Sequence, residues 1–141
     1  MSLFLLDTNI LIHGARRNEI WEKVILACNP MMSEARPLVH VVSQGEALAF
    51  AEQNSWGDAR RTQLAFLLGY FDAAQIGPRE IDAYALLDTY SRRLGFRMGK
   101  NDLWIAAAAH TTGATIVTCD KDFDHLDSKF LQRLWIDPTI P

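Results

Sequence analysis

Cysteine is scarce in this sequence, and positive charge is not in excess. The 141 residues include two cysteines, Cys28 and Cys119, which do not have CxxC spacing. A disulfide framework and a cysteine-rich zinc site are therefore not expected, and both cysteines fit the role of small apolar residues. The formal net charge is −3. A protein that coats nucleic acid by bulk electrostatics would be strongly basic, so any contact with nucleic acid must be local.

Long hydrophobic runs are also missing. The first residues, MSLFLLDTNILIH, contain no basic stretch, and Asp7 and Asn9 interrupt the apolar positions. We therefore expect neither a signal peptide nor a transmembrane helix, and we place the protein in the cytoplasm without a membrane partner. Hydrophobic residues still make up 49% of the chain. This content and length predict one domain over residues 1–141, with a core of its own.

Apolar patterns predict strands and helices that alternate along the chain. Strands are expected at residues 3–6, 38–42, 71–76, 115–118 and 134–136, and helices at about 8–15, 18–28, 43–51, 58–68, 78–94 and 101–112. Strands separated by helices need right-handed crossovers and form parallel sheets. The sequence therefore predicts an α/β fold in which helices sandwich a central parallel sheet.

Four acidic residues stand where such a chain turns toward one edge of its sheet: Asp7, Glu46, Asp102 and Asp120. Asp7 and Asp120 end predicted strands, whereas Glu46 and Asp102 are expected in first helical turns. Strand ends and helix starts share one edge of a parallel sheet, so all four carboxylates should face one cleft. Carboxylates gathered this way repel one another unless a cation holds them. Hard oxygen ligands suit Mg²⁺ or Mn²⁺, which most often serve phosphoryl chemistry.

Each acid also has a purely structural explanation. Ser43 and Glu46 match the S-x-x-E capping box, in which Glu46 would only accept a hydrogen bond from the Ser43 amide. Asp102 could favour the positive end of its helix, and Asp7 and Asp120 could be a cap and a turn residue. Caps need no particular edge of the sheet, whereas a metal site needs every acid at the same edge. The chain order provides that arrangement, so we favour the metal site.

Four segments follow one another in a specific order. They are FLLDTNILI at residues 4–12, the Ser43-x-x-Glu46 turn, DLWIAAAA at residues 102–109 and TCDKDF at residues 118–123. Together they resemble a PIN domain, and most closely the VapC-type ribonuclease toxins. The resemblance covers essentially the whole chain. It implies a compact PIN-like α/β/α sandwich, Mg²⁺- or Mn²⁺-dependent cleavage of RNA, a homodimer and a small cognate VapB-like antitoxin.

The resemblance also assigns roles to individual residues. The four acids match the acidic quartet of the family and are expected to bind the metal and to be catalytic. Asp122 is a possible fifth ligand, ranked below Asp120. Residues expected to orient the carboxylates rather than to bind the metal are Thr8, Asn9, Ser43 and Thr118.

Basic residues lie close to the acids in sequence. Arg92, Arg93, Arg97 and Lys100 immediately precede Asp102, and Arg16 and Arg17 follow the first predicted helix. Acids repel phosphate, so some nearby cation is needed for RNA binding, and the four residues before Asp102 are our candidates. The alternative is a solvated, salt-bridged surface.

Other functions remain as alternatives. A phosphatase of the HAD type needs D-x-D after its first strand, but position 9 is Asn9. A receiver domain needs paired acids after strand one, which Asp7 and Thr8 do not provide. Within the nucleases, a housekeeping RNA-processing or DNA-cleaving PIN enzyme is an alternative to a toxin. A PIN-like module that binds without turnover is the non-enzymatic alternative.

Overall fold

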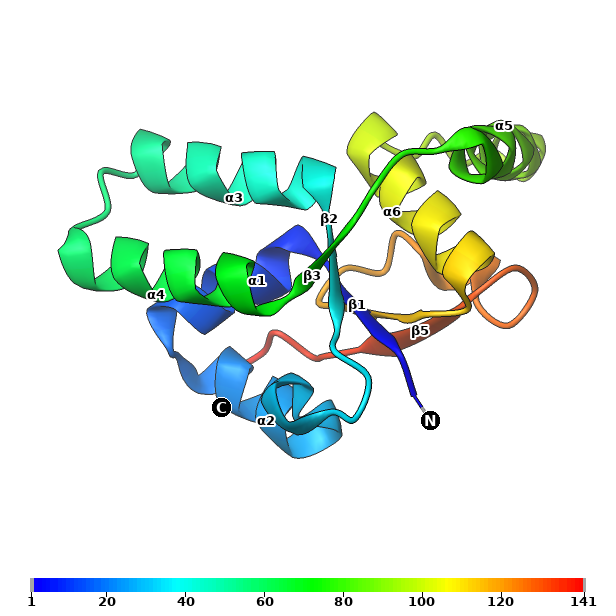
Figure 1. Ribbon diagram of the computed structural model, residues 1–141. Coiled ribbons are helices and arrows are strands. Elements are labelled where there is room, and N and C mark those ends of the chain that lie inside the picture. The colour runs from blue at the N-terminus through cyan, green and yellow to red at the C-terminus, as the bar shows by residue number, and fades with distance from the viewer. Residues whose placement is uncertain (1, 141) are drawn as a thin grey trace.

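The computed structural model describes residues 2–140 and shows helices on both sides of one sheet (Figure 1). The strands are β1 (Phe4–Leu6), β2 (Leu38–His40), β3 (Asp72–Ala74), β4 (Thr115–Thr118) and β5 (Gln132–Trp135). The helices are α1 (Thr8–Arg16), α2 (Glu19–Cys28), α3 (Val41–Gln53), α4 (Asp58–Tyr70), α5 (Pro78–Arg93) and α6 (Lys100–Thr112), with short 3-10 turns at Pro30–Met32 and Asp124–Leu126. The predicted α/β/α sandwich is confirmed.

All neighbouring strands of the sheet are parallel, in the order β3-β2-β1-β4-β5. From β1 the chain moves outward through β2 to β3, and it then returns to β4 on the other side of β1. The sheet therefore has a topological switch point between β1 and β4. In open α/β sheets, ligands bind beyond the carboxyl ends of the strands at this point.

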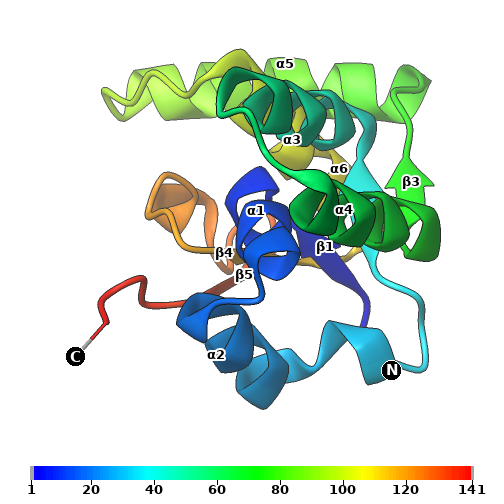
Figure 2. The same cartoon turned by 90° about the vertical axis from the view of Figure 1, so that its left-hand side faces the viewer.

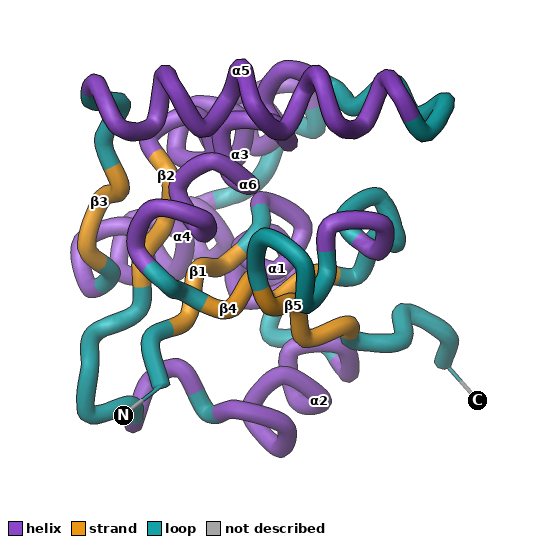
Figure 3. The backbone as a smooth tube through the Cα atoms, turned by 90° about the vertical axis from the view of Figure 1, so that its right-hand side faces the viewer, coloured by secondary structure: helices purple, strands orange, loops and turns teal. Residues whose placement is uncertain are grey.

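Alternate strand residues supply two separate cores. Leu6, Val39 and Val117 pack toward α1, α2, α3 and α4, which the view of Figure 2 brings to the front. Leu5 and Ile116 pack on the opposite face against α5 and α6, which Figure 3 shows from their own side. The strands are thus apolar on both faces, as parallel strands covered on two sides must be. This explains the short, uninterrupted apolar runs in the sequence.

Helix α1 packs tightly on α4. A Cβ atom on Gly14 would come within 2.9 Å of Leu67 Cδ1 on α4 and within 3.1 Å of the Trp21 ring. A glycine at this point therefore allows the two helices to approach each other.

Among residues 2–140, no helix combines the length and the apolar character needed to cross a bilayer.

One predicted boundary is wrong in a way that affects the site. We expected the second strand to reach Val42 and the next helix to begin at Ser43, but α3 already begins at Val41. The N-cap is His40, whose Nδ1 accepts a hydrogen bond from the Val42 amide at 3.1 Å. The β-branched pair Val41 and Val42 favours a strand by propensity, and the histidine cap overrides that preference.

Candidate metal centre at the carboxyl edge of the sheet

Asp7 and Asp120 stand on either side of the switch point. Asp7 directly follows β1, and its amide donates to the Val117 carbonyl of β4 at 3.0 Å. Asp120 lies two residues past the end of β4. Asp102 comes in from the first turn of α6. The sequence therefore placed these three acids correctly at one edge of the sheet.

A hydrogen-bond network joins Asp7 to Asp120. Thr118 Oγ1 donates to Asp7 Oδ2 at 2.7 Å and accepts from the Asp120 amide at 3.0 Å. Asn9 Nδ2 donates to Asp7 Oδ2 at 3.3 Å and to Asp120 Oδ2 at 3.1 Å. Asn9 Oδ1 accepts from the Cys119 amide at 3.3 Å, which holds the side chain in place. Asn9 and Thr118 thus orient two carboxylates from different strand ends.

Glu46 belongs to the same cluster. It lies in the second turn of α3, whereas the sequence predicted the first turn. Thr8 Oγ1 donates to Glu46 Oε1 at 2.8 Å, and the Thr8 amide donates to Asp7 Oδ1 at 2.8 Å. Thr8 therefore couples the acid of α3 to the acid of β1. Because α3 starts at Val41, the proposed capping box of Ser43 and Glu46 does not form.

Ser43 does not contact the acids in the way that the sequence suggested. Its side chain is fully buried in α3, and within residues 2–140 its Oγ atom has no hydrogen-bond partner. The supporting contact to Glu46 comes from Thr8 instead. No sequence signal pointed to that pair, because the two residues are 38 positions apart.

The carboxylates raise one another's pKa values. Burial raises the pKa of Asp7 from 3.8 to about 6, against the hydrogen bonds from Thr118 and Thr8, and the charges of Asp120 and Glu46 add to the increase. Burial also raises the pKa of Asp102 to about 7, and the next largest cause is the charge of Asp7. The pKa of Asp120 rises as well, through burial and then the charge of Asp122. The five acids therefore share one electrostatic field, which a cation would relieve.

Asp122 contributes charge to this field from slightly farther along the chain. It raises the pKa of both Asp102 and Asp120. Within residues 2–140, its carboxylate accepts no hydrogen bond and forms no ion pair. Whether it is a ligand remains a prediction.

A hollow of about 410 Å³ opens at the acids, between α3 and the start of α6. Glu46, Gly99, Lys100, Asn101 and Asp102 line it. In residues 2–140, Asp102 has neither a hydrogen-bond donor nor an ion-pair partner on its carboxylate, although it is half-buried. No three acidic, histidine or cysteine groups among those residues already have the spacing of a metal site. The charge and the all-oxygen donor set suit a hard divalent cation, but the ligands are not drawn together in advance.

The four candidate basic residues do not act as a group. Lys100 lines the hollow with Asp102, and Arg97 lines a neighbouring hollow with Asp122. Arg92 instead forms an exposed ion pair with Asp88 at 3.0 Å, one helical turn away. For Arg92, the salt-bridged surface is therefore the better interpretation. Arg93 is exposed in the last turn of α5.

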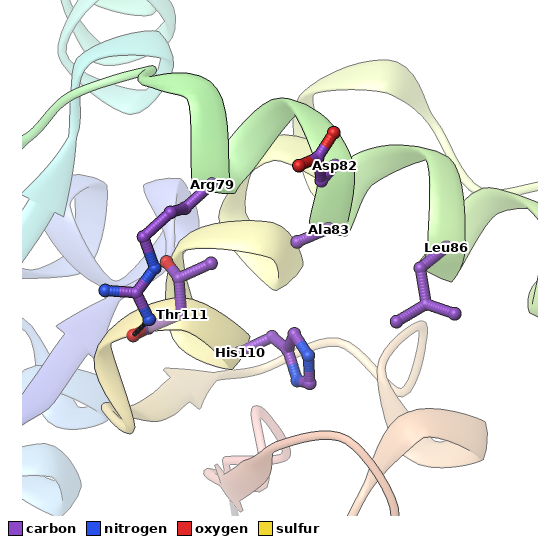
Figure 4. Close-up of a pocket in the computed structure, with 6 residues that line it drawn as sticks. All are labelled: Arg79, Asp82, Ala83, Leu86, His110 and Thr111. Atoms are coloured by element: carbon purple, nitrogen blue, oxygen red, sulfur yellow. Dashed lines mark hydrogen bonds between the residues drawn. The ribbon is translucent and has the colours of Figure 1, made fainter.

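Another hollow, of about 320 Å³, lies between α5 and the far end of α6 (Figure 4). Arg79 and Asp82 come from α5, and His110 and Thr111 come from α6. Arg79 Nη2 donates to the Thr111 carbonyl at 3.2 Å, and His110 Nδ1 lies 2.7 Å from the Phe130 carbonyl. These contacts tie elements together and gather no set of like charges. The clustered carboxylates lie at the other end of α6.

The PIN domain family model matches residues 4–129 of the chain. A comparison of the sequence with curated proteins found no match.

Solved structures share the fold at low sequence identity. A chain of VapBC2 from Rickettsia felis, bound to a DNA fragment from its promoter, aligns with a TM-score of 0.80 and 18% identity, over 96% of this chain and 100% of that one. A chain of VapBC-1 from nontypeable Haemophilus influenzae gives a TM-score of 0.72 and 19% identity, over 95% and 98%. A chain of VapBC-5 from Mycobacterium tuberculosis, described as a member of the VapBC family of toxin-antitoxin systems, gives 0.69 and 22%, over 96% and 100%.

Proposed function

Because this chain belongs to the PIN domain family, whose members are nucleases, we propose that it is a divalent-metal-dependent endoribonuclease and the toxin of a VapBC-type pair. The observation that carries the proposal is the convergence of Asp7, Glu46, Asp102 and Asp120 at the switch point. Burial, together with repulsion from the neighbouring acids, raises the pKa values of Asp7 and Asp102. Such a cost in stability is typical of a site built for a positively charged ligand.

PIN nucleases generally use divalent metals, and the acids of this chain fit that use. Asp7 and Asp102 would hold the ion, with Asp120 and Glu46 beside them and Asp122 as a further candidate. When bound, Mg²⁺ or Mn²⁺ would supply an activated water and would neutralise charge on the phosphodiester. Both ions accept these oxygen ligands.

The remaining residues of the cluster would keep the ligands in position. Asn9 and Thr118 hold Asp7 and Asp120 in one orientation. Thr8 holds Glu46 through its hydroxyl. Lys100, at the rim of the same hollow, would offset the repulsion between the acids and an incoming phosphate.

The proposed partners are a single-stranded RNA substrate, a small VapB-like antitoxin and a second copy of this chain, all in the cytoplasm. Solved relatives of the same fold come from VapBC structures, which supports the antitoxin. The chain would be co-expressed with the small antitoxin that a neighbouring gene is expected to encode. Light scattering of the purified complex would then give its mass, and from it the number of copies of each chain.

The second candidate within the family is a housekeeping nuclease that processes RNA or cleaves DNA. The same carboxylates would serve either substrate, because hydrolysis occurs at the phosphodiester. Growth after expression of the chain alone separates the two candidates. A toxin should arrest growth, and Asp7→Asn should abolish the arrest.

The direct test uses purified protein and total cellular RNA, with Mg²⁺ in one reaction and EDTA in the other. We expect fragments with discrete ends only with Mg²⁺, and none with Asp7→Asn. DNA strands of matched sequence provide the substrate control. Cleavage by Asp7→Asn at the wild-type rate would contradict the proposal, as would cleavage of RNA that persists in EDTA.

A further inference from the structure

The hollow that contains Arg97 and Asp122 has a volume of about 190 Å³ and is the second of the two hollows beside the acids. Phe96, Arg97, Lys121, Asp122 and His125 are among its lining residues, and it shares Gly99 with the hollow at Asp102. The loop between α5 and α6 forms one wall, and the segment after β4 forms the other. A molecule that spanned both hollows would therefore pass the carboxylates.

An aromatic platform stands in this second hollow. Phe96 is 49% exposed, and its ring stacks on the His125 ring with a centroid distance of 4.4 Å and an interplanar angle of 19°. His125 is itself held, because its Nε2 lies 2.8 Å from the hydroxyl of the fully buried Ser91. The lining of the hollow therefore includes a half-exposed aromatic residue that is backed by a second ring.

The backbone fixes the position of Phe96. The Phe96 amide donates to the Ser91 carbonyl at 2.9 Å, and the Gly95 amide donates to the Arg92 carbonyl at 3.0 Å. These two bonds form a Schellman motif, and Gly95 provides the left-handed residue with φ of +88°. The ring is therefore presented from a fixed point at the end of α5. Such pre-organisation lowers the entropic cost of binding.

Two cations flank the platform. Arg97 and Lys121 line the hollow, and among residues 2–140 neither of them forms an ion pair, although Lys121 Nζ lies 4.7 Å from the centroid of the Trp135 ring. Asp124 in the same hollow is already paired with Arg133 at 2.7 Å, so Asp122 is the acid left facing them. The chain as a whole carries a net charge of −3. Exposed Phe66 also shares a hollow with positive groups, those of Arg16, Arg17 and Arg60, but that hollow contains none of the four clustered acids.

We propose that Phe96, stacked on His125, is a platform for one unpaired base of the RNA, and that Arg97 and Lys121 bind phosphates next to that base. An exposed aromatic ring with cations at its side is how proteins hold single-stranded nucleic acid, because every base has a π-face. The platform would hold the strand beside the acids, so the cut would fall at a fixed distance from the stacked base. This inference rests on the proposed ribonuclease function and adds how the substrate is held.

A structural role for Phe96 predicts different behaviour under substitution. If the ring only fills space against His125, Phe96→Leu should preserve function and a larger ring should not improve on it. If the ring stacks on a base, Phe96→Leu should lose binding, and Phe96→Trp should keep or strengthen it. Phe66→Leu is the matched control, because Phe66 on α4 is 55% exposed and is also stacked on an aromatic ring, that of Tyr70.

The experiment measures binding of a fluorescent single-stranded RNA by anisotropy, with Asp7→Asn as the background so that the RNA stays intact. We expect Phe96→Leu to weaken binding by roughly 5- to 100-fold, with Phe96→Trp and Phe66→Leu near the background value. RNAs that lack the base at one position at a time should locate the stacked base. Removal of that base should weaken binding by the background protein and have little further effect on Phe96→Leu.

Two outcomes would overturn the platform: Phe96→Leu binding as tightly as the background, or Phe66→Leu losing as much. Loss of affinity for the antitoxin alone would assign the ring to the protein partner and would equally overturn the inference. Cleavage by the wild-type chain is measured in parallel. If the wild type cleaves RNA and the Phe96 variants bind normally, the inference fails alone. If the wild type does not cleave RNA, the proposed function fails.

Discussion

The two ends of helix α6 carry polar residues in different surroundings. At the N-terminal end, burial and then the charge of Asp7 raise the pKa of Asp102 to about 7. At the C-terminal end, about 13 Å along the helix, the polar groups of His110 and Thr111 are tied to Phe130 and Arg79. Both ends border a hollow of several hundred Å³. The convergence of like charges, rather than the presence of a hollow, therefore distinguishes the candidate site.

The two ends of α6 also have opposite effects on the stability of the folded chain. The contacts of Arg79 and His110 satisfy backbone carbonyls and so favour the folded chain. The acids at the other end work against folding, because each raises the free energy of its charged neighbours. Evolution commonly keeps such a cost where function requires it. The following predictions perturb the carboxylate cluster, and those on Asp102 use Asp82, at the other end of α6, as their reference.

The largest expected effect is on RNA cleavage. Asp102→Ala should lower cleavage by roughly 10³-fold or more, because it removes a carboxylate from a cluster that acts as a unit. Asp82→Ala, in the hollow at the far end, should cleave at close to the wild-type rate. Rates with Mg²⁺ on one defined RNA provide the measurement. Equal losses from both variants would remove the distinction between the two ends.

An intermediate effect is expected from Thr118, which contacts Asp7 without being a proposed ligand. Thr118→Val removes the donor to Asp7 Oδ2 and the acceptor of the Asp120 amide. We expect metal affinity to fall by roughly 10- to 100-fold, as for other residues that orient ligands. Thr118→Ser keeps the hydroxyl and should stay near the wild type. A loss that Thr118→Ser shares would point to packing of the methyl group instead.

The smallest expected effect is on stability without metal. A carboxyl group whose folded-state pKa is raised stabilises the protein fully below its ordinary value of 3.8, and this contribution is lost as the pH rises through about 7. The amide of Asp102→Asn does not ionise, so the variant does not undergo this loss of stability. The free energy of unfolding of the variant should therefore rise relative to that of the wild type between pH 4.5 and pH 8. The expected difference is about 1–2 kcal/mol after allowance for solvent screening.

Urea unfolding in EDTA across that pH range measures this difference. Burial lowers the pKa values of His13, His40 and His125, which makes the wild type more stable as the pH rises. The same histidines are present in the variant, so their contribution cancels in the comparison. Asp82→Asn should follow the wild type. A constant gap between Asp102→Asn and the wild type at all pH values would contradict the raised pKa of Asp102.

Much of the fold could be predicted, because hydrophobic period and turn residues act locally. The apolar runs before Asp7 and after Gly113 have strand character on their own, and Pro78 and Gly113 begin and end helices by their backbone preferences. The start of α3 was mispredicted because Val41 and Val42 have strand propensity, while the cap depends on the His40 side chain. The order of the strands, which creates the switch point, depends on long-range pairing that no local signal encodes.

The candidate site was predictable only in part, for the same reason. Asp7, Asp102 and Asp120 follow from their positions at strand ends and at a helix start. The supporting contact of Thr8 with Glu46 joins residues 38 positions apart, and that of Asn9 with Asp120 joins residues 111 apart. The platform of Phe96 and His125 depends on a fold that brings the end of α5 against the turn after β4. Charge and spacing could identify the candidate acids, and the family resemblance named Thr8, Asn9 and Thr118 as orienting residues. Which acid each of them contacts depends on the fold.

Direct binding of Mn²⁺ is the most immediate test of the central claim that the carboxylates at the switch point form a divalent-metal site. Isothermal titration at pH 8, where Asp7 and Asp102 are ionised, should show saturable binding by the wild type and by Asp82→Asn. Asp102→Asn should bind at least roughly tenfold more weakly, and Glu46→Gln should be weakened to a smaller extent. Absence of binding by the wild type, or equal binding by Asp102→Asn, would contradict the account.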